Sequence, residues 1–285
     1  MTAFARGRGV GSWTLDDIPW QRFAPDRLDP ELVRIVKAAS LVEHNGAAYA
    51  HHLCRVFADD REFQETARAW GAEEVQHGVA LARWAALADP AFDFAAAFVR
   101  FQAGYHVDFD SERSRRGSRA GEMVARCVVE IGTSSYYTAL REAAREPVLQ
   151  EICRHIAADE LRHYRLFYKT LDRYLAREPI GRLARLRVAL GRVAESEDDE
   201  LAYAYYAANE AERPYDRRHC SRAYARQAFA LYRPHHVERG VAMLLKAVGL
   251  TPNGRLARLV SRLAWQAMRY RASRLARLAR VARVA

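Results

Sequence analysis

Two Glu-x-x-His motifs are the parts of this sequence whose residue types and spacing suggest chemistry. Glu74 and His77 lie in "EEVQH", and Glu160 and His163 lie in "DELRH". Residues three apart share one face of an α-helix, so each motif presents a carboxylate and an imidazole to one point. A single copy is expected by chance in a chain of this composition, so the repetition carries the inference.

A further glutamate precedes each motif at nearly the same distance. Glu43, in "AASLVEHNGAAYA", precedes Glu74 by 31 positions, and Glu130, in "ARCVVEIGTSS", precedes Glu160 by 30. In two antiparallel helices joined by a short turn, residues about 30 apart lie at a similar height. The spacing therefore predicts that all six side chains meet at one level of a helical bundle.

Four carboxylates at one buried level are unstable without cations. Burial and mutual repulsion would force them to take up protons, and two divalent cations would remove both problems. Four carboxylates and two imidazoles are the ligand set expected for two iron ions, with a manganese–iron pair or manganese as alternatives. Helix bundles that bind two such ions use one Glu from each of two helices and Glu-x-x-His from the other two.

The elements that must position these groups are four long helices. Helix 31–58 pairs with helix 61–88, and helix 118–145 pairs with helix 147–177, each pair through a short connection. The sequence Asp29-Pro30-Glu31 is a typical helix start, and Asp60 can cap the second helix. No segment shows sustained strand-like alternation. We therefore predict an all-α four-helix bundle with one longer crossover, which contains a shorter helix over 91–105.

The remaining segments flank this bundle, which we place at residues 29–178. Residues 1–28 are expected to form an irregular leader that packs through Trp13 and Trp20. Residues 179–250 are expected to be a helical extension, with helical segments at 180–212, 215–232 and 234–250. Residues 251–285 are expected to form a basic amphipathic C-terminal helix.

Composition narrows the class of protein. Half of the 285 residues are hydrophobic, and glycine and proline are sparse, which favours helices with a sizeable core. The four cysteines have no C-x-x-C spacing, which predicts reduced thiols. No apolar run approaches the roughly 18 residues that cross a bilayer, and the first residues have no apolar signal region. We expect a cytoplasmic protein, with peripheral membrane association left open.

The two motifs resemble those of a known family. "EEVQH" and "DELRH" are similar to the E-E-x-x-H and D-E-x-R-H motifs of the soluble acyl-carrier-protein desaturases, which are ferritin-like di-iron proteins. The resemblance covers about residues 31–177. It implies a ferritin-like bundle in which two iron ions are bound by these six ligands: Glu43, Glu74, His77, Glu130, Glu160 and His163.

The same resemblance implies roles for residues around the ligands. Glu73 and Asp159 would accept hydrogen bonds from the imidazoles of the opposite half and fix their tautomer. Thr133, with Ser134 beside it, would supply a catalytic hydroxyl near the oxygen-binding side, with helix packing as the alternative. Trp20 could relay electrons, although packing is the simpler interpretation.

Other histidines and tyrosines are given structural interpretations. His44 adjoins a predicted ligand but points about 100° away on a helix. The doublets His51–His52 and His235–His236 have no evident acidic partner and are interpreted as surface or capping groups. Tyr136 and Tyr137 could approach the metal site, but core packing is the preferred interpretation.

The resemblance implies an oxygen-dependent di-iron oxidoreductase that desaturates or hydroxylates an unactivated C–H bond, with an acyl chain as the expected substrate. An external electron donor such as ferredoxin is implied, since the sequence has no flavin or iron–sulfur motif. One alternative is a ferroxidase or peroxidase of the ferritin or rubrerythrin type, although the chain lacks a rubredoxin-type cysteine pair. Others are a di-iron hydroxylase acting on tRNA and a structural helical protein with a vestigial site.

The C-terminal segment 254–285 needs its own explanation. From Arg255 to the end there are nine arginines and no acidic residue. An apolar stripe runs along one helical face, formed by Leu256, Leu259, Val260 and Leu263 and continued by Leu275, Leu278 and Ala282. The stripe could pack on the bundle, lie on anionic lipid, or accompany the attraction of an acidic macromolecule such as acyl carrier protein or tRNA. A homodimer is a further option.

Overall fold

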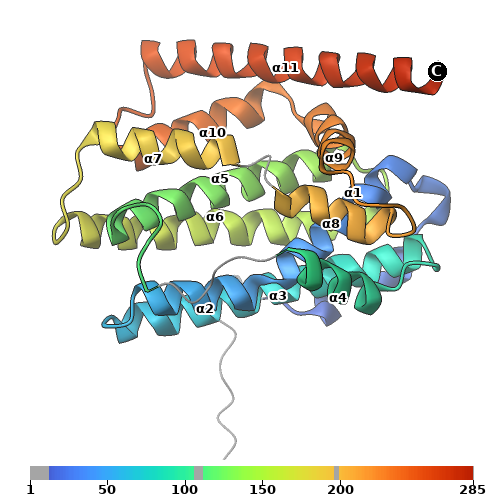
Figure 1. Ribbon diagram of the computed structural model, residues 1–285, viewed down its shortest axis with the longest axis horizontal. Helices are drawn as coiled ribbons and strands as arrows, with labels where there is room; N and C mark the ends of the chain where they lie inside the picture. Colours follow the sequence, from blue (N-terminus) through green and yellow to red (C-terminus); the bar gives the residue numbers. More distant parts are fainter. Residues whose placement is uncertain (1–12, 106–111, 196–198, 285) are drawn as a thin grey trace, which may run out of the picture.

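A computed structural model of the chain describes residues 13–105, 112–195 and 199–284, with side chains to residue 279. Within these ranges every regular element is a helix, and Figure 1 shows them arranged as stacked layers. The predicted all-α bundle is confirmed. The α-helices are α1 (Pro30–His44), α2 (Gly46–Val56), α3 (Arg61–Ala88), α4 (Phe94–Gly104), α5 (Arg119–Ala143), α6 (Pro147–Leu175), α7 (Arg182–Glu195), α8 (Asp199–Asn209), α9 (Arg217–Leu231), α10 (Pro234–Ala247) and α11 (Arg255–Val284).

Acidic caps begin the long helices where the sequence indicated. The Asp29 side chain accepts a hydrogen bond from the backbone N–H of Glu31 at 2.9 Å, and Pro30 is the first residue of α1. Asp60 accepts from the N–H of Phe63 at 3.0 Å and caps α3. These carboxylates satisfy N–H groups that have no partner inside the helix.

The expected helix 31–58 is broken, which corrects the prediction of a single element. At Asn45 the backbone N–H donates to the carbonyl of Val42 at 3.1 Å, so the α-helical ladder is interrupted by one tight turn. The backbone then lies close to α3, because a Cβ added at Gly46 would be only 2.2 Å from the Cβ of Glu74. A Cβ at Gly71 would be 3.0 Å from the Gly46 carbonyl oxygen. Two glycines therefore allow α2 and α3 to approach at a predicted ligand.

The helices pack in the predicted antiparallel pairs. Helix α5 packs along α6, α1 and α2 pack along α3, and α3 contacts α6 between the pairs. The expected helical segment 180–212 contains two helices, α7 and α8, which cover α5 and α1 respectively. Helices α9 and α10 also pack on α5, and α11 lies outermost on α9 and α10 (Figure 1). Among the described residues, no helix combines the length and apolar character needed to cross a membrane.

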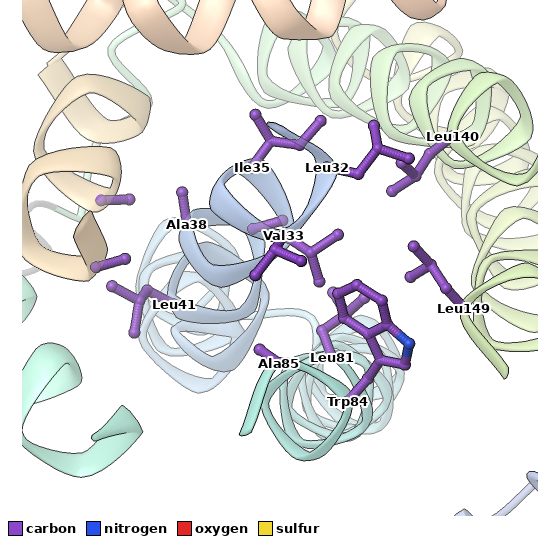
Figure 2. Close-up of a cluster of buried hydrophobic side chains, with 14 of the residues drawn as sticks. Leu32, Val33, Ile35, Ala38, Leu41, Leu81, Trp84, Ala85, Leu140 and Leu149 are labelled. Carbon is purple, nitrogen blue, oxygen red and sulfur yellow. The ribbon is translucent and has the colours of Figure 1, made fainter. Parts of the chain in front are cut away.

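Two apolar clusters fill the bundle on either side of one level. The first cluster contains Ile35 and Leu41 of α1, Leu81 and Trp84 of α3, and Leu149 of α6. In Figure 2, Leu81, Trp84 and Leu149 lie together on one side of α1, whereas Ile35 and Leu41 lie on other sides of that helix. The second contains, at the other end of the same helices, Leu53, Phe63, Trp70, Val124, Phe167 and Leu171. The level between them carries the predicted ligands.

The leader is not irregular throughout, which corrects the description of residues 1–28. Three short 3-10 helices form at Leu15–Asp17, Trp20–Arg22 and Pro25–Arg27. Glu146, the cap of α6, holds the leader in place by accepting a hydrogen bond from the backbone N–H of Ala24 at 3.1 Å. Its other carboxylate oxygen accepts a hydrogen bond from the indole of Trp84, on α3, at 2.7 Å. The first part of the leader, residues 1–12, lies outside the described residues.

The leucine stripe of the C-terminal helix does not pack on the bundle. Leu256, Leu259 and Leu263 are 54–60% exposed, whereas Ala257 and Ser261 are buried at 7% and 6%. The contact with α9 and α10 is therefore made by another face, which carries the buried Ala257 and Ser261 and the half-buried Met268 and Leu275. This contradicts packing of Leu256, Leu259 and Leu263 on the bundle, whereas Val260 and Leu275 of the predicted stripe are half-buried. The side chain of Ala282 lies outside the described part.

Candidate metal centre

The level between the two apolar clusters holds all six predicted ligands. Glu43 comes from α1, Glu74 and His77 from α3, Glu130 from α5, and Glu160 and His163 from α6, and each is at most 7% exposed. Two overlapping groups form, in which the possible ligand atoms lie within 4.8 Å of one another.

The first group surrounds His77. Its Nδ1 lies 3.6 Å from Glu43 Oε2, 3.8 Å from Glu74 Oε2 and 3.3 Å from Glu160 Oε1. Three carboxylates from three helices thus face one imidazole nitrogen. This grouping depends on the tertiary structure, since only Glu74 belongs to the motif of His77.

The second group surrounds His163 and is close to a mirror of the first. Its Nδ1 lies 3.0 Å from Glu74 Oε1, 3.6 Å from Glu130 Oε2 and 3.7 Å from Glu160 Oε2. Glu74 and Glu160 occur in both groups, and each directs one oxygen toward each imidazole. They have the geometry of carboxylates that bridge two centres, whereas Glu43 and Glu130 each serve one.

The atoms that face this level have no hydrogen-bond partner among the described residues. They are Nδ1 of both imidazoles, one oxygen each of Glu74 and Glu160, and both oxygens of Glu130. Buried polar atoms without partners are costly, and such sites usually mark an absent ion, water or functional group. Carboxylate oxygens and imidazole nitrogens are suitable ligands for iron and manganese, so the donor set fits a pair of such ions.

Without cations, the six groups reach neutrality by holding protons. Burial, followed by repulsion from neighbouring carboxylates, raises the pKa of Glu43 well above its usual value, and burial similarly raises the pKa of Glu130. Burial opposes the charge of His77 and His163, but their carboxylate contacts outweigh it and raise both pKa values. Burial also opposes ionisation of Glu74 and Glu160, but the imidazoles lower both pKa values. These directions favour protons on Glu43, Glu130 and both imidazoles and favour ionised Glu74 and Glu160.

Two carboxylates outside the donor groups contact the Nε2 atoms of the two imidazoles. Asp159 Oδ2 lies 3.0 Å from His77 Nε2, and Glu73 Oε2 lies 2.7 Å from His163 Nε2. Arg162 connects the two acids, with a hydrogen bond to Asp159 and one of 2.5 Å to Glu73. In the neutral ring that a cation requires, an Nε2–H that donates to a carboxylate leaves the Nδ1 lone pair for the interior. Arg162 was not identified from the sequence, although it is the Arg of "DELRH".

The leader tryptophan that reaches this network is Trp13 rather than Trp20. The Trp13 indole donates to Asp159 Oδ2 at 2.7 Å, and its ring stacks on His77 with centroids 6.1 Å apart. Trp20 instead donates to the Leu15 carbonyl and stacks under Arg83 on the outside of α3. The interpretation of Trp20 as packing agrees with this geometry.

Two hydroxyl groups contact the predicted ligands. Thr133 lies beside the second group and donates to Glu160 Oε2 at 2.7 Å, so its side chain is next to a predicted ligand that both donor groups share. Its catalytic role remains a prediction. Tyr137 donates to Glu43 Oε1 at 2.6 Å, so it approaches the site, which the sequence analysis allowed although it preferred core packing. Its position seven residues after Glu130 was the signal available. Ser134 is buried and donates to the Ile131 carbonyl.

A third cluster, of Glu142, His235 and His236, does not suit a metal. Both His235 Nε2 and His236 Nε2 lie 3.2 Å from Glu142, so the prediction that this doublet has no acidic partner was wrong. However, His236 Nδ1 accepts the backbone N–H of Arg233 at 3.0 Å at the start of α10. A neutral ring then carries its hydrogen on Nε2, which leaves no lone pair there for an ion. His44 packs against Phe94 and Phe98, away from the six ligands.

A family model matches the region of the chain that forms this centre. The model of the family described as "Fatty acid desaturase" matches residues 43–193, which is more than half of the 285 residues. The match begins at Glu43 and includes both Glu-x-x-His motifs. No curated protein matches the chain.

Proposed function

The chain belongs to the fatty acid desaturase family, and from that premise we propose that it is an oxygen-dependent di-iron oxidoreductase with a ferritin-like bundle. Its reaction is the desaturation or hydroxylation of an unactivated C–H bond, and its substrate is an acyl chain. The observation that carries the proposal is the pair of buried donor groups that share Glu74 and Glu160.

In this proposal the six ligands divide between two metal ions. Glu74 and Glu160 would contribute to the binding of both ions, Glu43 and His77 would hold one ion, and Glu130 and His163 would hold the other. Two iron ions would supply the reduction of O2 and the removal of hydrogen from carbon.

The residues outside the ligands prepare the site for this chemistry. Asp159 and Glu73 hold the imidazole tautomers, and the hydroxyl of Thr133 orients Glu160 through its hydrogen bond. The apolar clusters on both sides exclude water from the centre.

The electron balance requires a partner. Desaturation takes two hydrogens from the acyl chain, and O2 accepts four electrons to form two waters. Two of those electrons come from the substrate, so the other two come from a donor, for which we propose a ferredoxin. Hydroxylation also needs two donor electrons, since one oxygen atom enters the product and the other leaves as water.

The test begins with metal analysis of protein produced with ample iron. About two iron ions per chain are expected, and Glu130→Gln should lower this number. Glu122→Gln is the matched control, because Glu122 is also buried on α5 but contacts Ser114, away from the predicted ligands. Wild-type protein that carries neither iron nor manganese would overturn the proposal.

Activity then separates the reaction classes. Iron-replete protein, ferredoxin and its reductase, and an acyl-carrier-protein thioester should consume O2 and give an unsaturated or hydroxylated acyl chain by mass spectrometry. Oxidation of many Fe(II) ions per chain without an organic product would identify a ferroxidase instead. Oxygen insertion into a modified tRNA, without acyl turnover, would identify a tRNA hydroxylase.

A further inference from the structure

Helix α11 exposes an apolar stripe on the side that faces away from the protein. Leu256, Leu259, Leu263 and Tyr270 are 54%, 55%, 60% and 63% exposed. At about 100° per residue these four side chains fall within about 60° of one another. The buried Ala257 lies on a different face, where α11 contacts α10 and α9.

A row of arginines runs beside this stripe. Arg255, Arg258, Arg262 and Arg269 are all exposed, and on the helix they lie between the leucine stripe and the packed face. The sequence has no acidic residue from 255 to 285. The helix therefore presents adjoining apolar and cationic strips, and both face outward.

The apolar strip occupies the first half of the helix, because the exposed Arg274 and Arg277 fall on the same face beyond Tyr270. Helix α11 runs without interruption from Arg255 to Val284, which corresponds to about 45 Å. Figure 1 shows it along the outer edge of the molecule, where no other helix lies beyond it. A straight helix in this position can lie along a flat surface over much of its length.

We propose that α11 is a docking helix for an anionic phospholipid surface. The leucines and Tyr270 enter the boundary between headgroups and acyl chains, and the guanidinium groups beside them bind lipid phosphates. The protein would lie on the membrane rather than span it. A second copy of this chain is a poor occupant, because two such helices would bring their arginine rows together.

The arginines favour an anionic partner, and the exposed leucines favour a lipid surface over an acidic protein or a nucleic acid. An acidic protein or a nucleic acid would be attracted by the arginines alone, with a strong dependence on salt. A lipid surface requires both strips, since partitioning depends on apolar insertion together with charge. The two contributions can therefore be separated by substitution.

The experiment is co-sedimentation of the full chain with vesicles of phosphatidylcholine containing about one third phosphatidylglycerol. The wild-type chain should bind these vesicles and bind pure phosphatidylcholine vesicles at least tenfold more weakly. The triple variant L256S/L259S/L263S should lose at least tenfold in partitioning, because three exposed apolar side chains no longer insert. R255Q/R258Q/R262Q should lose a similar factor, and its residual binding should be less sensitive to salt.

The matched control is L87S/V99S, which removes exposed apolar residues from α3 and α4 on the opposite side of Figure 1. It should bind vesicles as the wild type does, and circular dichroism should show that every variant is folded. Absence of wild-type binding, or unchanged binding of the leucine variant, would overturn the proposal. Binding to polyglutamate or tRNA without vesicle binding would overturn it in favour of an acidic macromolecule. The measurement works on metal-free protein, so its outcome is independent of the proposed oxidoreductase activity.

Discussion

Substitution of Gly46 by alanine should disrupt the candidate metal centre although Gly46 carries no ligand atom. The added Cβ would lie 2.2 Å from the Cβ of Glu74, 3.1 Å from its Cγ and 3.0 Å from the Gly71 carbonyl oxygen. Ordinary contact begins near 3.4 Å. Because the Cβ of Glu74 is fixed to its backbone, either α2 or the backbone of α3 at Glu74 must move by more than about 1 Å, and the Gly71 backbone cannot yield easily.

The magnitude follows from this displacement. Overpacking of this kind typically costs about 1–3 kcal/mol of the free energy of unfolding. For a chain of this length that corresponds to a fall in the melting temperature on the order of 2–10 °C. Because Glu74 belongs to both donor groups, its displacement should weaken the binding of both ions rather than one.

The assays are thermal denaturation of the metal-free protein and metal analysis after reconstitution with Fe(II). Gly46→Ala should show the lower melting temperature and clearly fewer than two iron ions per chain. The matched control is Gly132→Ala, which lies two residues after Glu130 but has no heavy atom within 4 Å of the added Cβ. In a helix interior this control should be neutral or stabilise by up to about 1 kcal/mol. A Gly46→Ala protein with unchanged melting temperature and full iron content would refute the argument that close backbone approach positions Glu74.

Three further predictions concern protons, the outer carboxylates and the cap of α6. The pKa directions favour protons on both imidazoles and on Glu43 and Glu130 in the metal-free centre, so metal binding should release about four protons near neutral pH and should weaken as pH falls. Calorimetry in buffers of different ionisation enthalpy measures the number of protons released. A value near zero would contradict the assigned protonation. Asp159→Asn should reduce metal affinity about 10–100-fold without abolishing the fold, as measured by competition with a chelator, and unchanged affinity would mean that the contact with His77 does not control the site. Glu146→Ala should lower the free energy of unfolding by about 3 kcal/mol or more in urea titrations, because the Trp84 indole and two backbone N–H groups lose their buried acceptor, and a loss under 1 kcal/mol would contradict this role.

The sequence by itself determined the helical class, the helix starts and the level of the six donors. Periodic apolar residues and acidic caps place the long helices, because these signals act within a few residues. The offset of about 30 between Glu43 and Glu74, and between Glu130 and Glu160, follows from two helices joined by a short turn. These signals depend on residues at most about 30 positions apart, so they can be recognised in the sequence alone.

Only the tertiary structure decided which atoms meet and which faces remain exposed. The sharing of Glu74 and Glu160 between two imidazoles, and the contact of Trp13 with Asp159, depend on side chains separated by many residues. The break at Asn45 arises where the Gly46 backbone meets α3. The same holds for α11, whose sequence marks an apolar stripe but not its direction. A helix packs through the face that fits its neighbours most closely, and in α11 that face carries Ala257 and Ser261 rather than Leu256, Leu259 and Leu263.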